Sequence, residues 1–260
     1  MSFFRGLCLA ILVLLSPSGL ARAQTAVDLE LVLAVDISRS MDMEEQRLQR
    51  QGYIDALGHP AVMQAIQSGF LGRIAIVYVE WGGPIIQDVI VPWTVVEDPA
   101  SMQTVLDTLA ETRLRAVLDT SISEALYFAA DLFPDNDIEG SRLVMDVSGD
   151  GPNNLGRKVE PARDEVIARG IVINGLPLMI QGANHGPWNI KDLDVYYTDC
   201  VIGGPGAFVI PINDFANFAE GVRRKLILEI AGRTPEPQHR IMLAQLTPRD
   251  SKMDCLIGEK

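Results

Sequence analysis

Short apolar runs alternate with amphipathic stretches along most of this chain. The run LELVLAVDI at residues 29–37 is almost continuously apolar, as is typical of a central strand buried on both faces. Apolar residues at helical spacing mark longer segments between such runs. The pattern predicts strands at residues 29–37, 73–81, 85–96, 142–147, 170–178 and 207–210, and helices at residues 43–57, 102–112, 121–133, 159–169 and 215–230.

The order of these segments predicts an α/β fold. Residues 142–178 give a strand, a helix and a second strand in turn, which is a βαβ unit and requires parallel pairing. A Gly-Gly-Pro turn at residues 82–84 connects two other strands so closely that they are expected to be antiparallel neighbours. The central sheet is therefore predicted to be mixed but mostly parallel.

Two predicted helices carry signals at their amino ends. Ser121 and Glu124 form a capping-box pattern at the start of one helix. Asn213 is placed to cap the last helix. The apolar stripe of that helix consists of Phe215, Phe218, Val222, Leu226 and Ile230. The core domain is expected to end where this helix ends.

The two ends of the chain differ from the part between them. Arg5 precedes a short apolar run and a small-residue site at residues 21–23, which is typical of a secretory signal peptide. A membrane span needs about 20 apolar residues, so residues 1–23 are predicted to be cleaved and the protein to be periplasmic or extracellular. Residues 24–231 form the predicted domain. Residues 232–260 have three prolines and no sustained period, which predicts a tail packed on that domain.

The balance of charge narrows the class of partner. The chain has 22 basic and 34 acidic residues, for a net charge of −12. Nucleic acid and anionic membrane surfaces are therefore excluded as expected partners. Cations and basic surfaces fit this charge better.

Two cysteines, Cys200 and Cys255, remain after removal of the signal peptide. In an oxidising compartment an even pair favours a disulfide. Two free buried thiols are the alternative.

Oxygen-bearing side chains lie where predicted strands end. Residues 36–40 have the sequence DISRS, and their alternating carboxylate and hydroxyls would leave the carboxyl edge of a central strand on one side. Thr120 precedes a predicted helix and Asp150 follows the fourth predicted strand, so three loops are expected to converge. Such hard oxygen ligands suit Mg²⁺ or Mn²⁺. Taken singly, each residue also fits a turn or a helix cap.

This arrangement resembles the von Willebrand factor A domain over residues 27–231, with an Asp-x-Ser-x-Ser loop, a Thr and an Asp. The resemblance implies a Rossmann-like three-layer αβα sandwich with one antiparallel edge strand. It also implies a metal-ion-dependent adhesion site that holds a divalent ion, with Mg²⁺ preferred and Mn²⁺ or Ca²⁺ as alternatives. The implied ligands are Asp36, Ser38, Ser40, Thr120 and Asp150. The layout also resembles a bacterial family of secreted proteins of this type with no assigned function.

In the resembled family, a carboxylate of a protein partner fills an open coordination position on the ion. The net acidity of this chain would suit a partner that presents one carboxylate among basic residues. Asp119 departs from the family pattern, which often has glycine there, and its carboxylate would either tighten metal binding or repel an acidic ligand. Residues 180–206 form a longer connection, rich in glycine and aromatic residues, that the family pattern does not define.

Other polar side chains are interpreted as solvated. His185 lies in a loop, where a lone histidine is mostly exposed to solvent. The acidic residues Asp135, Asp137 and Glu139 alternate like a Ca²⁺ loop but lack the rest of an EF-hand. The basic residues Arg223, Arg224 and Lys225 are interpreted as the solvent-exposed face of the last helix.

Three classes of function follow from these features. The first is a binding module that engages a protein partner through the metal ion. The second is a Mg²⁺-dependent hydrolase of the phosphatase type, but Ser38 occupies the position where such enzymes need a second acid, so the chain is predicted not to be an enzyme. The third is a structural envelope protein whose site has no metal function.

Overall fold

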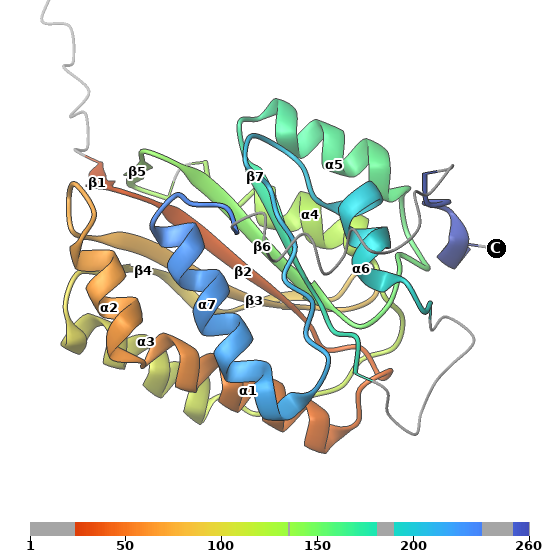
Figure 1. The fold of residues 1–260 in the computed structure, drawn as a ribbon, viewed down its shortest axis with the longest axis horizontal. Coiled ribbons are helices and arrows are strands. Elements are labelled where there is room, and N and C mark those ends of the chain that lie inside the picture. Colours follow the sequence, from red (N-terminus) through yellow and green to blue (C-terminus); the bar gives the residue numbers. More distant parts are fainter. Residues whose placement is uncertain (1–23, 135, 181–189, 236–251, 260) are drawn as a thin grey trace, which may run out of the picture.

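The computed structural model describes residues 24–134, 136–180, 190–235 and 252–259 (Figure 1). The predicted signal peptide, His185 and Asp135 lie outside these ranges, and what was expected of them stays a prediction. No helix within the described ranges is both long and apolar enough to cross a membrane.

A five-stranded sheet forms the centre of the fold, with the strand order β4-β3-β2-β6-β7. All neighbouring strands pair in parallel except β3 and β4, which are antiparallel. The strands are β2 (Glu30–Asp36), β3 (Ile74–Trp81), β4 (Gln87–Val96), β6 (Leu143–Gly149) and β7 (Val172–Pro177). The prediction of a mostly parallel sheet with one antiparallel edge strand is confirmed.

Helices cover both faces of this sheet and complete a three-layer sandwich (Figure 1). One face carries α1 (Met43–Leu57), α2 (Pro60–Gln67), α3 (Pro99–Glu111) and α7 (Phe218–Ile230). The other carries α4 (Ile122–Ala130), α5 (Val159–Ala168), α6 (Leu193–Tyr196) and a π-helix (Tyr197–Val201). Every residue of β2 is buried, and its successive side chains enter the two cores alternately, which explains the continuous apolar run.

Several short elements differ from the sequence prediction. A second sheet pairs β1 (Thr25–Val27) with β5 (Ile138–Gly140), and α2 was not predicted. The predicted strand at residues 207–210 is not continuous, since its segment forms only isolated bridges beside β7. Pro211 lies between these bridges and has no N–H to donate to a ladder.

Both predicted helix caps are wrong. Ser121 makes no capping hydrogen bond, and the Glu124 carboxylate instead accepts hydrogen bonds from Arg157. A 3-10 turn (Phe215–Asn217) precedes α7, and the Asp214 side chain, one residue after Asn213, accepts from the backbone N–H of Asn217. Oxygen-bearing side chains near a helix start can bond to several neighbouring donors, and the sequence alone does not reveal which bond forms.

The predicted exposure of Lys225 is wrong. Its side chain is 0% exposed, with Nζ 2.7 Å from Asp146 Oδ1 and paired with Glu229 one helical turn later. Asn174 donates to Glu229 Oε1 over 2.8 Å. Lys225 lies three residues after Val222 of the apolar stripe and so shares its buried face, where an acid on β6 offsets its charge.

Stability is expected to fall as pH rises from about 4 to about 7 because of this buried cluster. Burial, followed by the charge of Glu229, raises the pKa of Asp146 to about 7, against the opposing effect of Lys225. Between the ordinary and the raised pKa, the folded protein holds a proton that the unfolded chain releases. Urea unfolding across this range should show the loss, and Asp146→Asn should flatten it; an unchanged slope in that variant would assign the effect to other carboxyls.

Candidate metal centre

The Asp36 carboxylate lies at the carboxyl end of β2 and is fully buried. Its Oδ1 accepts a hydrogen bond from the backbone N–H of Ser38 over 2.7 Å. Its Oδ2 has no hydrogen-bond partner among the described residues. A buried carboxylate oxygen without a partner costs free energy, so this atom marks a position suited to a cation.

Ser38 and Ser40 connect Asp36 to Asp150, the first through its backbone N–H and both through their hydroxyls. Ser38 Oγ and Ser40 Oγ are 2.8 Å apart, and Ser40 Oγ donates to Asp150 Oδ1 over 2.6 Å. Val35 pairs with Ser148 across β2 and β6, so both aspartates leave the same edge of the sheet. The structure thus brings four of the five predicted residues together through direct contacts.

Thr120 joins this group through its backbone. Its N–H donates to Asn154 Oδ1, and its carbonyl accepts from the Asn154 N–H, both over 3.0 Å. Asn154 lies in the loop that follows Asp150, so the second and third predicted loops are fixed to one another. Among the described residues, the Thr120 side chain makes no hydrogen bond to these serines or aspartates, and its role as a ligand stays a prediction.

The departure at Asp119 has a backbone explanation. Asp119 adopts a positive φ of 65°, in the left-handed region that favours glycine and tolerates Asp better than most other residues. An aspartate can therefore stand where the resembled family often has glycine. Asp119 is exposed.

The electrostatics of the site favour a cation. Burial raises the pKa of Asp36 well above its ordinary value, and the neighbouring charge of Asp150 raises it further. Burial also raises the pKa of Asp150, to about 6, although the hydrogen bond from Ser40 opposes this. The simultaneous ionisation of Asp36 and its neighbour Asp150 is unfavourable, and a divalent ion would offset both negative charges.

The donor set fits a hard divalent ion. Within the described part of the chain, no three or more His, Cys, Asp or Glu side chains form a metal-binding group. Any ion held here would therefore depend on hydroxyl oxygens as well as the two carboxylates. Mg²⁺, Mn²⁺ and Ca²⁺ accept such ligands, whereas softer metals prefer imidazole or thiolate.

Tyr197 is a residue of this site that the sequence did not reveal. Its hydroxyl is buried and has no hydrogen-bond partner among the described residues. A Cβ added to Gly149 would lie 2.8 Å from this hydroxyl and 3.0 Å from Asp36 Oδ2. Burial raises the pKa of Tyr197, as do the charges of Asp36 and Asp150. Glycine at position 149 therefore leaves room for a neutral phenol beside the orphan carboxylate oxygen.

Residues 252–259, near the end of the chain, contact the elements around the candidate metal centre. Cys200, in the π-helix that begins at Tyr197, forms a disulfide with Cys255, which confirms the predicted pairing. Asn153 donates through Nδ2 to Glu259 Oε1 over 2.9 Å, and its Oδ1 accepts from the Ser123 N–H over 3.0 Å. Residues 252–259 thus contact both the helix of Tyr197 and the loop after Asp150.

Comparison with known sequences gives the family. A family model described as "Protein of unknown function (DUF1194)" matches residues 26–234, which include all five predicted metal ligands. The chain belongs to this family. No curated protein sequence matches it.

Solved structures of von Willebrand type share the fold. Proximal thread matrix protein 1 from the mussel byssus, with a zinc occupied MIDAS motif, has a TM-score of 0.55 at 13% identity, covering 80% of this chain and 47% of its own. The pilus adhesin SpaC from Lactobacillus rhamnosus GG has a TM-score of 0.58 at 12% identity, with 81% and 31% covered. A von Willebrand factor type A protein from Catenulispora acidiphila has a TM-score of 0.51 at 17% identity, with 79% and 43% covered.

This chain spans less than half the length of each of these three proteins. At 12 to 17% identity, the likeness shows the fold alone. The predicted von Willebrand type architecture is therefore confirmed.

Proposed function

We propose that this chain is a secreted or periplasmic, non-enzymatic binding module that holds a divalent ion and uses it to bind a carboxylate of a protein partner. Mg²⁺ is the proposed ion, with Mn²⁺ and Ca²⁺ as alternatives. The proposed ligands are Asp36, Ser38, Ser40, Thr120 and Asp150. The orphan Asp36 Oδ2, buried at a sheet edge beside two hydroxyls and a second carboxylate, is the observation that carries the proposal.

The protein residues in this proposal have distinct tasks. Asp36 and Asp150 supply negative charge from two strands, and the Ser38 backbone N–H orients the first carboxylate. The Ser40 hydroxyl donates to Asp150 and lies 2.8 Å from the Ser38 hydroxyl, so it links the Asp150 carboxylate to the loop that follows Asp36. When bound, the ion would supply the positive charge that offsets both acids and a position for an external oxygen ligand.

The wider comparisons support the same proposal. One structure of the mussel protein carries zinc at a MIDAS motif, and SpaC is a pilus adhesin. The disulfide between Cys200 and Cys255 is the kind of bond found in oxidising compartments. Export to the periplasm or beyond is part of the proposal.

Metal binding should stabilise the protein against heat. An ion at about 100 times its dissociation constant is expected to add about 2.7 kcal/mol to the free energy of unfolding. For a chain of this size, Tm should then rise by roughly 5 to 10 °C. The measurement is thermal unfolding with EDTA and then with millimolar Mg²⁺, Mn²⁺ or Ca²⁺.

Asp36→Asn keeps the size of the side chain, removes its charge and is expected to abolish this rise in Tm. Asp131→Asn is the matched control, since Asp131 is an exposed acid at the other end of α4. A wild-type protein that no ion stabilises, or an equal rise in Asp36→Asn, would contradict the proposal. Mg²⁺-dependent hydrolysis of p-nitrophenyl phosphate that Asp36→Asn abolishes would instead favour the hydrolase.

A further inference from the structure

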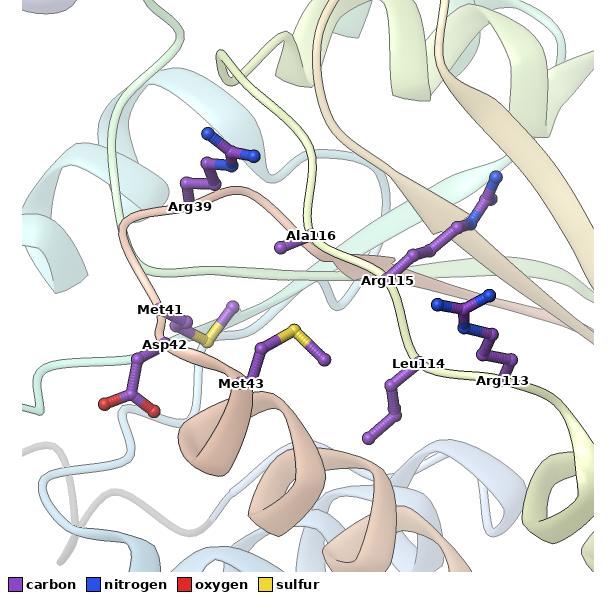
Figure 2. A pocket seen from close by; sticks show the side chains of 8 residues that line it. All are labelled: Arg39, Met41, Asp42, Met43, Arg113, Leu114, Arg115 and Ala116. Atoms are coloured by element: carbon purple, nitrogen blue, oxygen red, sulfur yellow. The ribbon is translucent and has the colours of Figure 1, made fainter.

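An open pocket of about 670 Å³ lies directly beside the candidate metal centre. It is lined by Arg39, Met41, Asp42, Met43, Arg113, Leu114, Arg115 and Ala116 (Figure 2). Arg39 stands between the two serines of the predicted metal loop, and its N–H donates to the Val117 carbonyl over 2.8 Å. This bond joins the metal loop to the segment that forms the other wall, so the pocket adjoins the candidate metal centre.

Three arginine side chains line this pocket, although the protein as a whole is acidic. Arg39 lies on one side of it, and Arg113 and Arg115 lie on the other, all three exposed (Figure 2). The whole chain has a net charge of −12. The lining, with three arginines and one aspartate, therefore carries net positive charge, in contrast to the whole molecule.

Two of these arginines are available to a ligand. Arg115 forms an ion pair with Asp88 and lies 3.9 Å from a carboxylate oxygen of Glu80. Arg39 and Arg113 form no ion pair with the part of the chain that the structure describes. Each of these two guanidinium groups could therefore bind an anion without a protein carboxylate being displaced from it.

The single acid in the lining is already engaged. Asp42 caps α1, where its carboxylate accepts from the backbone N–H groups of Glu44 and Glu45 over 2.8 and 2.9 Å. A capping carboxylate is held at the helix N-terminus, where the helix dipole favours its charge. It keeps its negative charge but, among the described residues, forms no ion pair with the arginines across the pocket.

The rest of the lining is apolar. Met43 and Leu114 lie between Asp42 and Arg113 (Figure 2), and the Met43 side chain is 43% exposed. Exposed apolar side chains beside guanidinium groups provide contact area for the stem of a long acidic side chain or for an aliphatic neighbour.

We infer that this pocket binds a second acidic side chain of the same protein partner whose first carboxylate completes the metal ion. The recognised segment would carry two or more carboxylates, one at the ion and one at an arginine of this pocket, with an aliphatic group on Met43. The inference rests on the proposed function and refines it. From net charge, the sequence suggests a partner with one carboxylate among basic residues. The inference replaces that expectation with an acidic segment, because the partner would meet the local charge beside the ion rather than the net charge of the chain.

The experiment uses a fluorescein-labelled hexaglutamate peptide as the probe, with binding followed by fluorescence anisotropy at millimolar MgCl₂. The double variant Arg39→Gln/Arg113→Gln should weaken binding by about tenfold, corresponding to about 1.4 kcal/mol. The matched control Arg169→Gln/Arg233→Gln removes the same charge from exposed positions at the opposite edge of the sheet and should bind as the wild type does. Hexaglutamine and inorganic phosphate serve as competitors and should not displace the probe.

A probe that binds the double variant as tightly as the wild type would overturn the inference, as would equal loss in the control variant. Displacement by phosphate at comparable concentration would also overturn it, since a general anion site would then be present. Arg113→Gln alone, outside the metal loop, should account for part of the loss. Failure of the proposed function looks different: Asp36→Asn would retain wild-type probe affinity while the arginine variants lose it.

Discussion

Replacing Lys225 with methionine is expected to destabilise the fold by about 3 to 5 kcal/mol, because breaking a buried ion pair leaves uncompensated charge in the core. Methionine preserves most of the length of the side chain, so lost packing is a small part of this effect. Asp146 and Glu229 would remain beside each other, 2% and 0% exposed at their side chains, without their cation. Urea unfolding at neutral pH measures the loss directly.

Arg224→Met is the matched control for this prediction. Arg224 precedes Lys225 on α7 but is exposed, and its replacement should change the free energy of unfolding by less than about 0.5 kcal/mol. Adding Asp146→Asn and Glu229→Gln to the Lys225→Met variant should restore much of the stability, since no buried charge is then unpaired. A Lys225→Met variant as stable as Arg224→Met would show that the cluster does not need its cation.

The main elements of the fold could be predicted because burial leaves a long signal in the sequence. β2 is buried on both faces, so its run of apolar residues is nearly continuous. The strands β1 and β5 have three residues each, too few for any period to emerge. Lys225 follows two arginines in the sequence, and the buried acid that pairs with it, Asp146, lies on β6, so no local pattern shows this partner.

Some residues of the candidate site could likewise be predicted from the sequence, and others could not. Asp36, Ser38, Ser40 and Asp150 could be placed together because parallel strands deliver their carboxyl ends to one edge of a sheet. Tyr197 could not, since it reaches Gly149 from a π-helix on the covering layer and no spacing links it to Asp36. The arginine pocket was also missed, because its two walls come from segments that are far apart in the sequence.

The disulfide should affect both stability and metal binding. Replacing Cys200 and Cys255 by alanine opens a loop of 55 residues in sequence, which by the chain-entropy estimate costs about 4 kcal/mol. Removal of the bond should also release Glu259 from Asn153, whose side chain holds the Ser123 N–H at the start of α4. Urea unfolding measures the first effect, and the Mg²⁺ concentration for half-maximal stabilisation measures the second.

The Mg²⁺ midpoint shows whether the disulfide supports the metal centre or only stabilises the fold. Cys200 and Tyr197 share one π-helix, so greater freedom there should move the phenol beside Asp36 Oδ2 and raise the Mg²⁺ midpoint. Lys252→Gln is the control, because it removes only an exposed ion pair with Glu160 from the same terminal segment and should cost less than about 1 kcal/mol. A double cysteine variant that loses stability but keeps the wild-type Mg²⁺ midpoint would limit the disulfide to holding the tail. A raised midpoint would instead show that the end of the chain supports metal binding, through its contacts with Asn153 and with the π-helix of Tyr197.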